Sequence, residues 1–521
     1  MTRYQKGLIA VLATWGVFFT TMWPRMLFYG KTGIMGYTDL WSDWAAHFGY
    51  AATFAYRSAS DWFLSHPFFV HQKFTYPFLV DAISGLLIKS GLDQVASFVI
   101  PSIVLSLLLI IVLYTFYFEH LKSPKQAFLA LTLFLANGSL GFIYFFSEQG
   151  DYSRLDNHDI YWYNIVSCEL LPQRSFLLGI VLALTIIILL QKWMTKKIEH
   201  TTCLKLILLS ILTSLLMLCH VYSLVILLLI ACALFLFNRH YHYYFIIYIG
   251  LSLALSLILY VVFFSGGTHL SSFHWRLGWM SDVRKTNIFY FWLLNFGLFL
   301  PIALVGIWKK KLITSPIILV SVILFILANV VQFQTWDWDT TKILTWGYLI
   351  FCIPVVTFLA DIWKRNHVAK VFVVLIVLSM TATGFWSLAR TFRTHDLSYS
   401  MWTYDEIKLA DAFRQESKPT DIVLTSDDHH HFIPTLTGRP IVMGYRGWLW
   451  SYGFNYNEEE KDISGMYSGT NNAYELLKKY QIRYVVIGPS ERANFNVNET
   501  FFSTQFEKIL EDKNYRIYKI N

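Results

Sequence analysis

Charged residues are scarce in this sequence: Asp, Glu, Lys and Arg make up 15% of its 521 residues. Soluble globular proteins carry about 25%, so an ordinary soluble fold is excluded for most of the chain. Hydrophobic residues make up 55%, and the mean hydropathy is +0.45. The net charge of +8 is then to be interpreted by its position relative to a membrane. The sequence predicts a polytopic α-helical membrane protein without a nucleic-acid partner.

Cysteine is also sparse, and its spacing excludes two kinds of site. The five cysteines show no paired spacing, and most of them lie inside apolar runs, so we expect neither a disulfide framework nor a zinc site. They are Cys168, Cys203, Cys219, Cys232 and Cys352. The sequence also lacks a G-x-G-x-x-G motif and a phosphate-binding loop, so no nucleotide site is predicted.

Long apolar runs predict eleven membrane spans. The first follows Arg3 and Lys6 and has no small-residue cleavage site after it, so we interpret it as an uncleaved span. The run 76–92 is short and contains Asp81 and Lys89, so we expect a surface or half-inserted helix there. The eleven predicted spans are 8–28, 96–117, 126–146, 175–192, 203–218, 221–237, 244–264, 288–307, 313–332, 342–361 and 369–389.

Basic residues predict the orientation of these spans. Cytoplasmic connections are enriched in Lys and Arg. When the run 76–92 is not counted as a span, every basic cluster falls on the cytoplasmic side. Counting 76–92 as a span would place all of them outside. We therefore expect a multi-pass protein of the cell membrane with a cytoplasmic N-terminus and an extracytoplasmic C-terminus. The clusters lie at 120–125, 192–197, 239–240, 309–311 and 364–365.

The polar residues outside these clusters gather on the predicted external side. The external connections include a large first loop, 29–95, and the loops 147–174, 265–287 and 333–341. From about Asp405 the charge rises and apolar runs stop. Helical patterns at 405–415 and 473–480 alternate with strand patterns at 421–425, 440–443, 484–487 and 515–520. We predict a membrane domain over 1–395 and a small extracytoplasmic α/β domain over 396–521.

The stretch 37–47 carries the most distinctive chemistry. If it is helical, Asp39, Asp43 and His47 lie on one face, because residues four apart are neighbours on a helix. Carboxylates at a membrane edge are costly to place without a use, so one of them is a candidate catalytic base. The alternative is an amphipathic interfacial helix whose charges face water.

Two cations at external span ends are candidates for binding a phosphate. Arg174 and Lys342 have the right chemistry, but such side chains also extend to the interface without binding anything. His220 lies in a short turn, where it is either a packing residue or a ligand. Asp337 and Asp339 lie beside Trp336, and they either bind substrate or only anchor the interface.

Metal binding stays open at this point. Asp39, Asp43, His47, His220 and Asp337 could converge on an ion, but no local spacing requires it. No cofactor is assigned, and a divalent metal at Asp39, Asp43 and His47 is retained as an alternative. The cluster His429-His430-His431 after Asp427-Asp428 is interpreted as a polar turn or an acceptor contact.

The order of these features resembles the GT-C superfamily of membrane glycosyltransferases. Members include protein O-mannosyltransferases, the aminoarabinose transferase of lipid A and oligosaccharyltransferases. The matching stretches are 39–47, His66-Pro67 with 74–78, 336–342, 438–440, 443–445 and 484–492; the last three resemble the tails of uncharacterised bacterial members. The sequence lacks the Asp-Glu pair of several members, so both Asp39 and Asp43 stay candidates.

This resemblance implies an inverting transfer of a hexose or pentose from a polyprenyl-phosphate donor. The acceptor would be an extracytoplasmic glycan, lipid or protein of the cell envelope, and an acidic residue of the first external loop, Asp43 or Asp39, would be the base. Membrane lipids would be the other partners. The residues expected to bind substrate are His47, Tyr76, Arg174, His220, Trp336, Asp337, Asp339, Lys342, Arg439 and Tyr445.

Two other functions compete with this interpretation. A transporter or flippase of a lipid-linked glycan would favour repeats, broken spans and ionisable residues near the midplane, whereas the predicted spans are nearly free of charge. A non-catalytic scaffold for glycan assembly is the third. The sequence specifies neither the sugar, nor the acceptor, nor the oligomeric state.

Overall fold

The computed structural model describes the chain except residues 148, 195–201, 267–272, 335, 471 and 521. The chain divides into two compact units. Unit 1 contains Met1–Arg25, Ser102–Leu259 and Ser272–Asp396. Unit 2 contains Met26–Pro101, Tyr260–Ser271 and Leu397–Asn521. Each unit is described by itself, and the predicted functional division at 395/396 stays a prediction.

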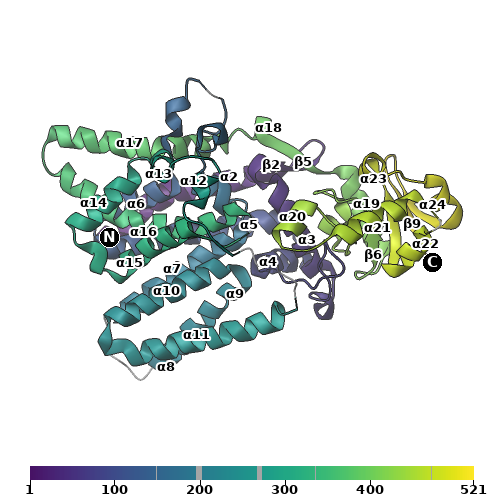
Figure 1. Ribbon diagram of the computed structural model, residues 1–521, viewed down its shortest axis with the longest axis horizontal. Coiled ribbons are helices and arrows are strands. Elements are labelled where there is room, and N and C mark those ends of the chain that lie inside the picture. The colour runs from purple at the N-terminus through teal and green to yellow at the C-terminus, as the bar shows by residue number, and fades with distance from the viewer. Residues whose placement is uncertain (148, 195–201, 267–272, 335, 471, 521) are drawn as a thin grey trace. The chain divides into compact units, whose positions relative to one another are not determined.

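Unit 1 is built almost entirely of helices (Figure 1). Local capping signals set several starts: Ser123 caps a helix with Pro124 at its first position, and Asn287 and Asn366 cap two others. The helices are α1 (Arg3–Val11), α2 (Val17–Met26), α5 (Gln94–Leu121), α6 (Pro124–Leu135), α7 (Arg174–Met194), α8 (Thr202–Ser214), α9 (Leu216–Cys219), α10 (Val221–Phe237), α11 (His242–Phe263), α12 (Trp279–Asp282), α13 (Ile288–Phe296), α14 (Phe299–Lys309), α15 (Pro316–Val330), α16 (Asp337–Trp363) and α17 (His367–Arg390); the ends of α2, α5 and α11 extend into unit 2.

The described residues contain six helices long and apolar enough to cross a membrane, or seven if the bent pair α13 and α14 is one span. Four shorter apolar helices, of 10–17 residues, accompany them at Pro124–Leu135, Leu204–Cys219, Val221–Phe237 and Pro316–Val330. Each of the eleven predicted runs coincides with one of these elements. The multi-pass helical architecture is therefore confirmed, whereas the count of eleven spans is not.

Two of the predicted spans depart from continuous helices. The run 126–146 is α-helical only to Leu135 and ends in the short 3-10 helix Leu140–Tyr144. Between them Asn137 binds the backbone of Tyr163 and Ile165. The run 288–307 is bent by 95° between α13 and α14. Gly297 ends α13 with a φ of +54°, a conformation that glycine adopts more readily than other residues.

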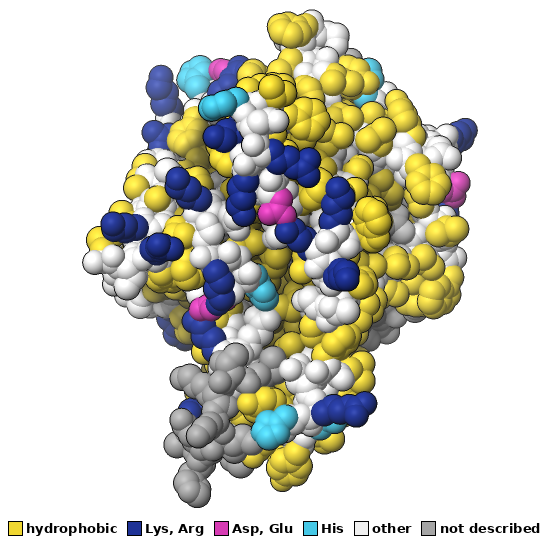
Figure 2. All heavy atoms as spheres, turned by 90° about the vertical axis from the view of Figure 1, so that its left-hand side faces the viewer, with side chains coloured by type: hydrophobic (Ala, Val, Ile, Leu, Met, Phe, Trp, Pro, Cys, Tyr) yellow, Lys and Arg dark blue, Asp and Glu magenta, His cyan; other side chains and the backbone are white. Residues whose placement is uncertain are grey.

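Lys and Arg side chains gather on the face of unit 1 shown in Figure 2, with few acidic ones among them. In unit 1, ion pairs join helix ends: Lys192 of α7 lies 2.9 Å from Glu119 of α5, and Lys310, just after α14, pairs with Asp361 of α16. α4 (Leu79–Lys89), in unit 2, has 11 residues, about half of what a spanning helix needs. These features agree with the predicted orientation, which stays a prediction.

Cysteine labelling tests that orientation. We expect Lys122→Cys, between α5 and α6, and Lys125→Cys, in the first turn of α6, to react with a membrane-impermeant maleimide only after the cells are permeabilised. The positive-inside bias places this connection in the cytoplasm. A cysteine at Tyr474, in the C-terminal part, is the control and should react in intact cells. Labelling of positions 122 and 125 from outside would contradict the predicted topology.

Unit 2 combines the first polar loop with the C-terminal part of the chain. β1 (Leu27–Tyr29), β2 (Gly33–Tyr37) and β5 (Ser398–Thr403) form an antiparallel sheet in the order β1-β2-β5. α3 (Thr38–Tyr56) follows β2 directly and packs on α4. The two sequence regions are therefore tied together by backbone hydrogen bonds at the start of α3.

The C-terminal part contains a mixed sheet in the order β6-β7-β9-β8, in which only β6 and β7 are parallel. Its core is formed by buried residues such as Val485, Ile487 and Phe502. The remaining elements of unit 2 are α19 (Tyr404–Glu416), β6 (Ile422–Leu424), α20 (Arg446–Ser451), α21 (Asn457–Ser468), α22 (Ala473–Lys479), β7 (Ile482–Ile487), α23 (Pro489–Asn494), α24 (Glu499–Gln505), β8 (Glu507–Glu511) and β9 (Arg516–Lys519); α18 (Thr394–Leu397) lies at the boundary.

The predicted α/β alternation is found here, with one strand misplaced and one missed. Residues 440–443 form only single bridges, Ile441 with Val423 and Met443 with Phe69. The backbone N–H groups of Ile441 and Gly444 instead bind the carbonyls of Pro67 and Phe68, in the first loop. β8 was not predicted, because its sequence Glu-Lys-Ile-Leu-Glu lacks the β-branched pattern of a strand.

Candidate functional site

Asp39 and Asp43 lie in the first turns of α3, and both are half-buried. The helix begins at Thr38 because β2 ends there, where Tyr37 pairs with Ser398 of β5. Asp39 lies in the first turn, where the helix dipole favours a negative charge. The helix that the sequence argument took as its condition is thus present, and both carboxylates lie near its N-terminus.

His47 is buried one turn further along α3, and its Nδ1 lies 2.8 Å from Oδ2 of Asp81 in α4. Asp81 is completely buried, and its other oxygen has no hydrogen-bond partner among the described residues. In the sequence, Asp81 indicated only that the run 76–92 does not span the membrane. The position of Asp81 inside an apolar run was the available signal, because a buried carboxylate needs a buried polar partner.

Tyr76 belongs to a group of rings beside this pair. It stacks on Tyr50 with ring centroids 4.7 Å apart and meets the ring of His47 at 5.9 Å. The Tyr50 hydroxyl lies 2.7 Å from the hydroxyl of Tyr452 in the C-terminal part. The predicted substrate residues His47 and Tyr76 therefore lie together in unit 2.

The histidine cluster contacts α3 directly. Nε2 of His430 donates a hydrogen bond to the Trp41 carbonyl at 2.7 Å, and its ring centroid is 4.1 Å from that of Trp41. Burial lowers the pKa of His430 to about 4, so its imidazole is neutral at physiological pH. The ring of His429 stacks on Tyr445, another predicted substrate residue, at 3.4 Å.

Arg439 has a structural position in unit 2. Its buried guanidinium donates to the carbonyls of Arg414, Ser417 and Thr437 and to the Ser417 hydroxyl. Arg57, at the end of α3, is equally buried and donates to the carbonyls of Gly438 and Ser65. These bonds tie the loop around Gly438 to α3 and α19. The prediction that Arg439 binds substrate gains no support from them.

Unit 1 carries a second polar group, centred on Glu169 in the π-helical turn Val166–Leu170. Its carboxylate accepts hydrogen bonds from the hydroxyls of Thr341 and Thr345, at 2.7 and 2.6 Å. Burial raises the pKa of Glu169, and the two hydrogen bonds, which by themselves lower it, only partly offset this effect. Glu169 was not singled out from the sequence, although a carboxylate three residues before a Pro in an external loop was visible there.

Lys342 lies in the same region and is paired with Asp339 at 2.5 Å, one turn away on α16. Both of these predicted residues are largely shielded from solvent. Trp336, just before the helix, is about half exposed, at 49%. Asp337 begins α16, but its side chain lies outside the described part of the structure.

His220 caps α10: its Nδ1 accepts from the Ser223 N–H and lies 2.8 Å from the Ser223 hydroxyl. Trp346 of α16 donates to the same hydroxyl, and Phe176 of α7 packs on the His220 ring at 4.4 Å. Because Nδ1 is an acceptor, a neutral ring carries its proton on Nε2, which is buried without a hydrogen bond to described residues. Arg174, at the start of α7, is also buried.

A divalent metal finds no assembled set of ligands in the described residues. No group of three or more His, Cys, Asp or Glu side chains among them is arranged to hold an ion. Within the alternative set Asp39, Asp43 and His47, the ring of His47 is engaged by Asp81. We therefore assign no step of the chemistry to a metal.

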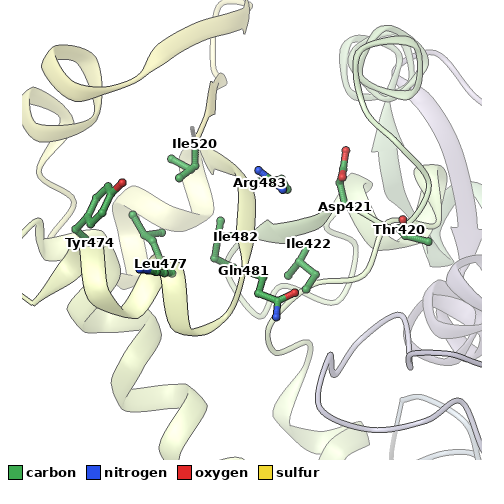
Figure 3. A pocket seen from close by; sticks show the side chains of 10 residues that line it. Thr420, Asp421, Ile422, Tyr474, Leu477, Gln481, Ile482, Arg483 and Ile520 are labelled. Carbon is green, nitrogen blue, oxygen red and sulfur yellow. The ribbon is translucent and has the colours of Figure 1, made fainter.

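A separate groove of about 420 Å³ opens in the C-terminal part, at the beginnings of β6 and β7. Figure 3 shows Asp421 and Thr420 on one side of it and Tyr474 and Leu477 on the other. Its floor is apolar, with Ile422, Ile482 and Ile520. Its polar side chains are mostly exposed, so the groove is not built around a buried recognition group.

Comparison with solved structures identifies the fold. The oligosaccharyltransferase of Archaeoglobus fulgidus in its apo form is similar over 92% of this chain and 69% of its own, with a TM-score of 0.54 and 12% identity. AglB from the same organism, in complex with an inhibitory peptide and a dolichol-phosphate, has a TM-score of 0.51 and 11% identity over 93% of this chain and 70% of its own. ArnT from Cupriavidus metallidurans, in the apo state, has a TM-score of 0.50 and 10% identity over 99% of this chain and 98% of its own.

Comparisons of the sequence itself add nothing to this. No family model matches the chain, and no curated protein matches it. At 10–12% identity the structural likeness establishes the fold alone. The GT-C fold predicted from the sequence is thereby confirmed.

Proposed function

We propose that this chain, which has the GT-C fold, is a membrane glycosyltransferase that moves a sugar from a polyprenyl-phosphate donor to an acceptor outside the cytoplasm. Fold alone does not imply function, so the proposal depends on the site. The observation that carries it is the pair of half-buried carboxylates, Asp39 and Asp43, at the start of α3. Both come from the first external loop, as the resemblance to the family requires.

The proposed reaction is a direct displacement with inversion at the anomeric carbon. Asp43 takes the proton of the acceptor hydroxyl as its oxygen attacks that carbon, and the bond from the sugar to the phosphate breaks. Polyprenyl phosphate leaves as a stable anion, so the reaction needs a base but no acid. The incoming oxygen and the leaving phosphate lie on opposite sides of the sugar, which inverts its configuration.

The leaving phosphate would be received by the polar group of unit 1. Lys342 supplies a positive charge once the phosphate replaces Asp339 as its partner, and His220 supplies a buried Nε2–H donor, while Arg174 begins the neighbouring α7. Such groups stabilise negative charge as it develops in the transition state. Glu169 holds Thr341 and Thr345 on either side of Lys342 and so fixes that turn of α16.

In this proposal residues 1–395 provide catalysis and donor binding, and 396–521 form an extracytoplasmic domain on the acceptor side. The sequence predicts that Asp43, Arg174, His220 and the turn 336–342 serve one reaction, and this stays a prediction. Two of the solved AglB structures hold an acceptor peptide or a dolichol-phosphate, which supports a lipid-linked donor for this chain as well. The sugar is a hexose or a pentose.

Release of polyprenyl phosphate tests the proposed function. The full chain in lipid nanodiscs would be incubated with polyprenyl-phosphate hexoses and pentoses labelled in the sugar. We expect one donor to release polyprenyl phosphate together with a labelled product of inverted anomeric configuration, read by NMR. Absence of release from every donor, in protein that melts cooperatively, would contradict a glycosyltransferase.

A flippase of lipid-linked glycans is the second candidate, and one observation favours it. The helix pair α13 and α14 is broken by a 95° bend, and broken helices are typical of transporters. The same preparation in liposomes separates the two functions. Movement of an intact donor across the bilayer, with its sugar still attached, would support the transporter instead.

A further inference from the structure

Four aromatic rings of unit 2 contact one another near the start of α3. We call the set Trp41, His429, Tyr445 and Trp448 the aromatic platform. His429 lies 3.4 Å from Tyr445 and 5.5 Å from Trp41, measured between ring centroids. Trp448 stands edge-on to His429 at 5.3 Å and to Tyr445 at 5.5 Å.

Three rings of the platform are partly exposed, and one of them belongs to α3, the helix of the candidate base. Trp41, His429 and Tyr445 are half-buried, whereas Trp448 is buried beneath them. Trp41 lies in α3 two residues from Asp39 and two from Asp43, so its side chain leaves the helix on the other side from both carboxylates. A molecule resting on these rings therefore lies against the first turns of that helix, and several linked sugar rings are needed to extend from there to the carboxylates.

Buried hydrogen bonds fix the loop that carries His429. His431 Nε2 and the Ser426 N–H both donate to the same Glu491 oxygen, at 3.1 and 2.8 Å. Trp402 donates to the His430 carbonyl at 2.7 Å. Burial opposes ionisation of Glu491, but the nearby His431 and the bonds from Ser426 outweigh it and lower the pKa to about 2. The loop is thus preorganised, which reduces the entropy lost when a ligand binds.

The charges around the platform do not suit an anionic ligand. Arg446, its neighbouring cation, is engaged by Asp427 at 2.7 Å and by Glu460 at 2.6 Å. The exposed Asp428 adds negative charge, and burial lowers the pKa of His429, which keeps that ring neutral. The described residues here offer flat apolar rings and oxygen acceptors, with the cation already paired.

We propose that the aromatic platform binds a neutral sugar ring, so that the acceptor of this enzyme is a carbohydrate chain. The C–H face of a sugar is apolar and flat and packs on aromatic rings, while its hydroxyls donate to carboxylate and tyrosine oxygens. The phosphate of a lipid acceptor would find Arg446 already paired with Asp427 and Glu460. The role of this sugar as the acceptor rests on the proposed function, whereas its binding to the aromatic platform does not.

Saturation-transfer NMR with the full chain in nanodiscs tests the binding. The probes are four neutral tetrasaccharides (maltotetraose, cellotetraose, mannotetraose and chitotetraose), a tetragalacturonate and a Ser/Thr-rich decapeptide. We expect at least one neutral tetrasaccharide to bind and the other two classes to be silent. Failure of all four at millimolar concentration, or binding of only the peptide or the anionic sugar, overturns the proposal.

Substitutions then locate the site. His429→Ala and Tyr445→Ala should each weaken the affinity for the bound tetrasaccharide by about tenfold, as expected for loss of one ring contact. Tyr474→Ala is the matched control, because it removes an exposed ring of the groove in Figure 3, in the same part of the chain. Unchanged affinity in both platform variants, with melting temperatures like the wild type, would place the sugar elsewhere and overturn the proposal.

Donor turnover separates this proposal from the function on which it depends. If a tetrasaccharide binds through the platform but no donor releases polyprenyl phosphate, sugar binding at the platform is supported and the glycosyltransferase activity is contradicted. If polyprenyl phosphate is released and the sugar is transferred to a peptide, with the platform variants fully active, the glycosyltransferase stands and the platform fails.

Discussion

Asp43→Asn is expected to abolish sugar transfer while leaving the protein folded. The amide keeps the shape of the carboxyl group but cannot take the proton of the acceptor hydroxyl. General-base catalysis typically contributes about 10²- to 10⁴-fold, and we expect a loss in that range. The measurement is the initial rate of polyprenyl-phosphate release, with the melting temperature as a test of folding.

Asp39→Asn is the matched control, because it makes the same change one helical turn earlier. Asp43 is preferred as the base since it lies one turn from His47, which is fixed by Asp81. Asp39 lies in the first turn, where its charge also stabilises the helix, so its replacement should cost less activity. Transfer near the wild-type rate in Asp43→Asn would reject this assignment, and a loss confined to Asp39→Asn would move the base to Asp39.

The parts of the fold that could be predicted are those with local signals. Apolar runs located the membrane helices, and the four-residue spacing put Asp39, Asp43 and His47 on one face on the condition that the stretch is helical, which α3 meets. Breaks inside apolar runs were harder, because the run 288–307 reads as one helix although Gly297 bends it. Glycine is common in membrane helices, so a glycine in this run does not by itself predict a bend.

The candidate site was only partly predictable, since its partners are far apart in the sequence. Asp81 meets His47 across 34 residues, and Glu169 meets Thr341 across 172. His430 reaches Trp41 across 389 residues. No periodicity relates such positions, and no spacing rule connects them. The charge pattern did locate both polar groups on the predicted external side, but the pairing itself is a product of the tertiary fold.

Residues 440–443 show why the C-terminal strands were less reliable than the helices. The pattern Pro-Ile-Val-Met suits a strand, yet its N–H groups bind the carbonyls of Pro67 and Phe68 in the first loop. A strand pattern states that a segment will be buried and extended, but not which neighbour completes its hydrogen bonds. The segment therefore joins the two sequence regions of unit 2, and it meets β6 only through the single bridge between Ile441 and Val423.

Removing either partner of the His47–Asp81 pair is expected to destabilise unit 2 strongly. Both side chains are almost completely buried, at 5% and 0% exposure, with 2.8 Å between Nδ1 and Oδ2. Breaking a buried pair from one side typically costs about 3–5 kcal/mol, because the remaining polar group is left unsatisfied. His47→Phe should be the more damaging, since Asp81 has no other hydrogen bond among the described residues.

The double substitution His47→Phe with Asp81→Leu makes this prediction specific to the pair. Replacing a buried ion pair by apolar side chains of similar volume is often neutral, so the double variant should recover most of the stability lost in either single variant. Lys89→Ala, at the exposed end of α4, is the control for a change in the same helix. Thermal unfolding of the wild type, the two single variants and the double variant in nanodiscs provides the double-mutant cycle. Additive losses would show that the two residues act independently, and α3 would then owe its position to packing on α4 alone.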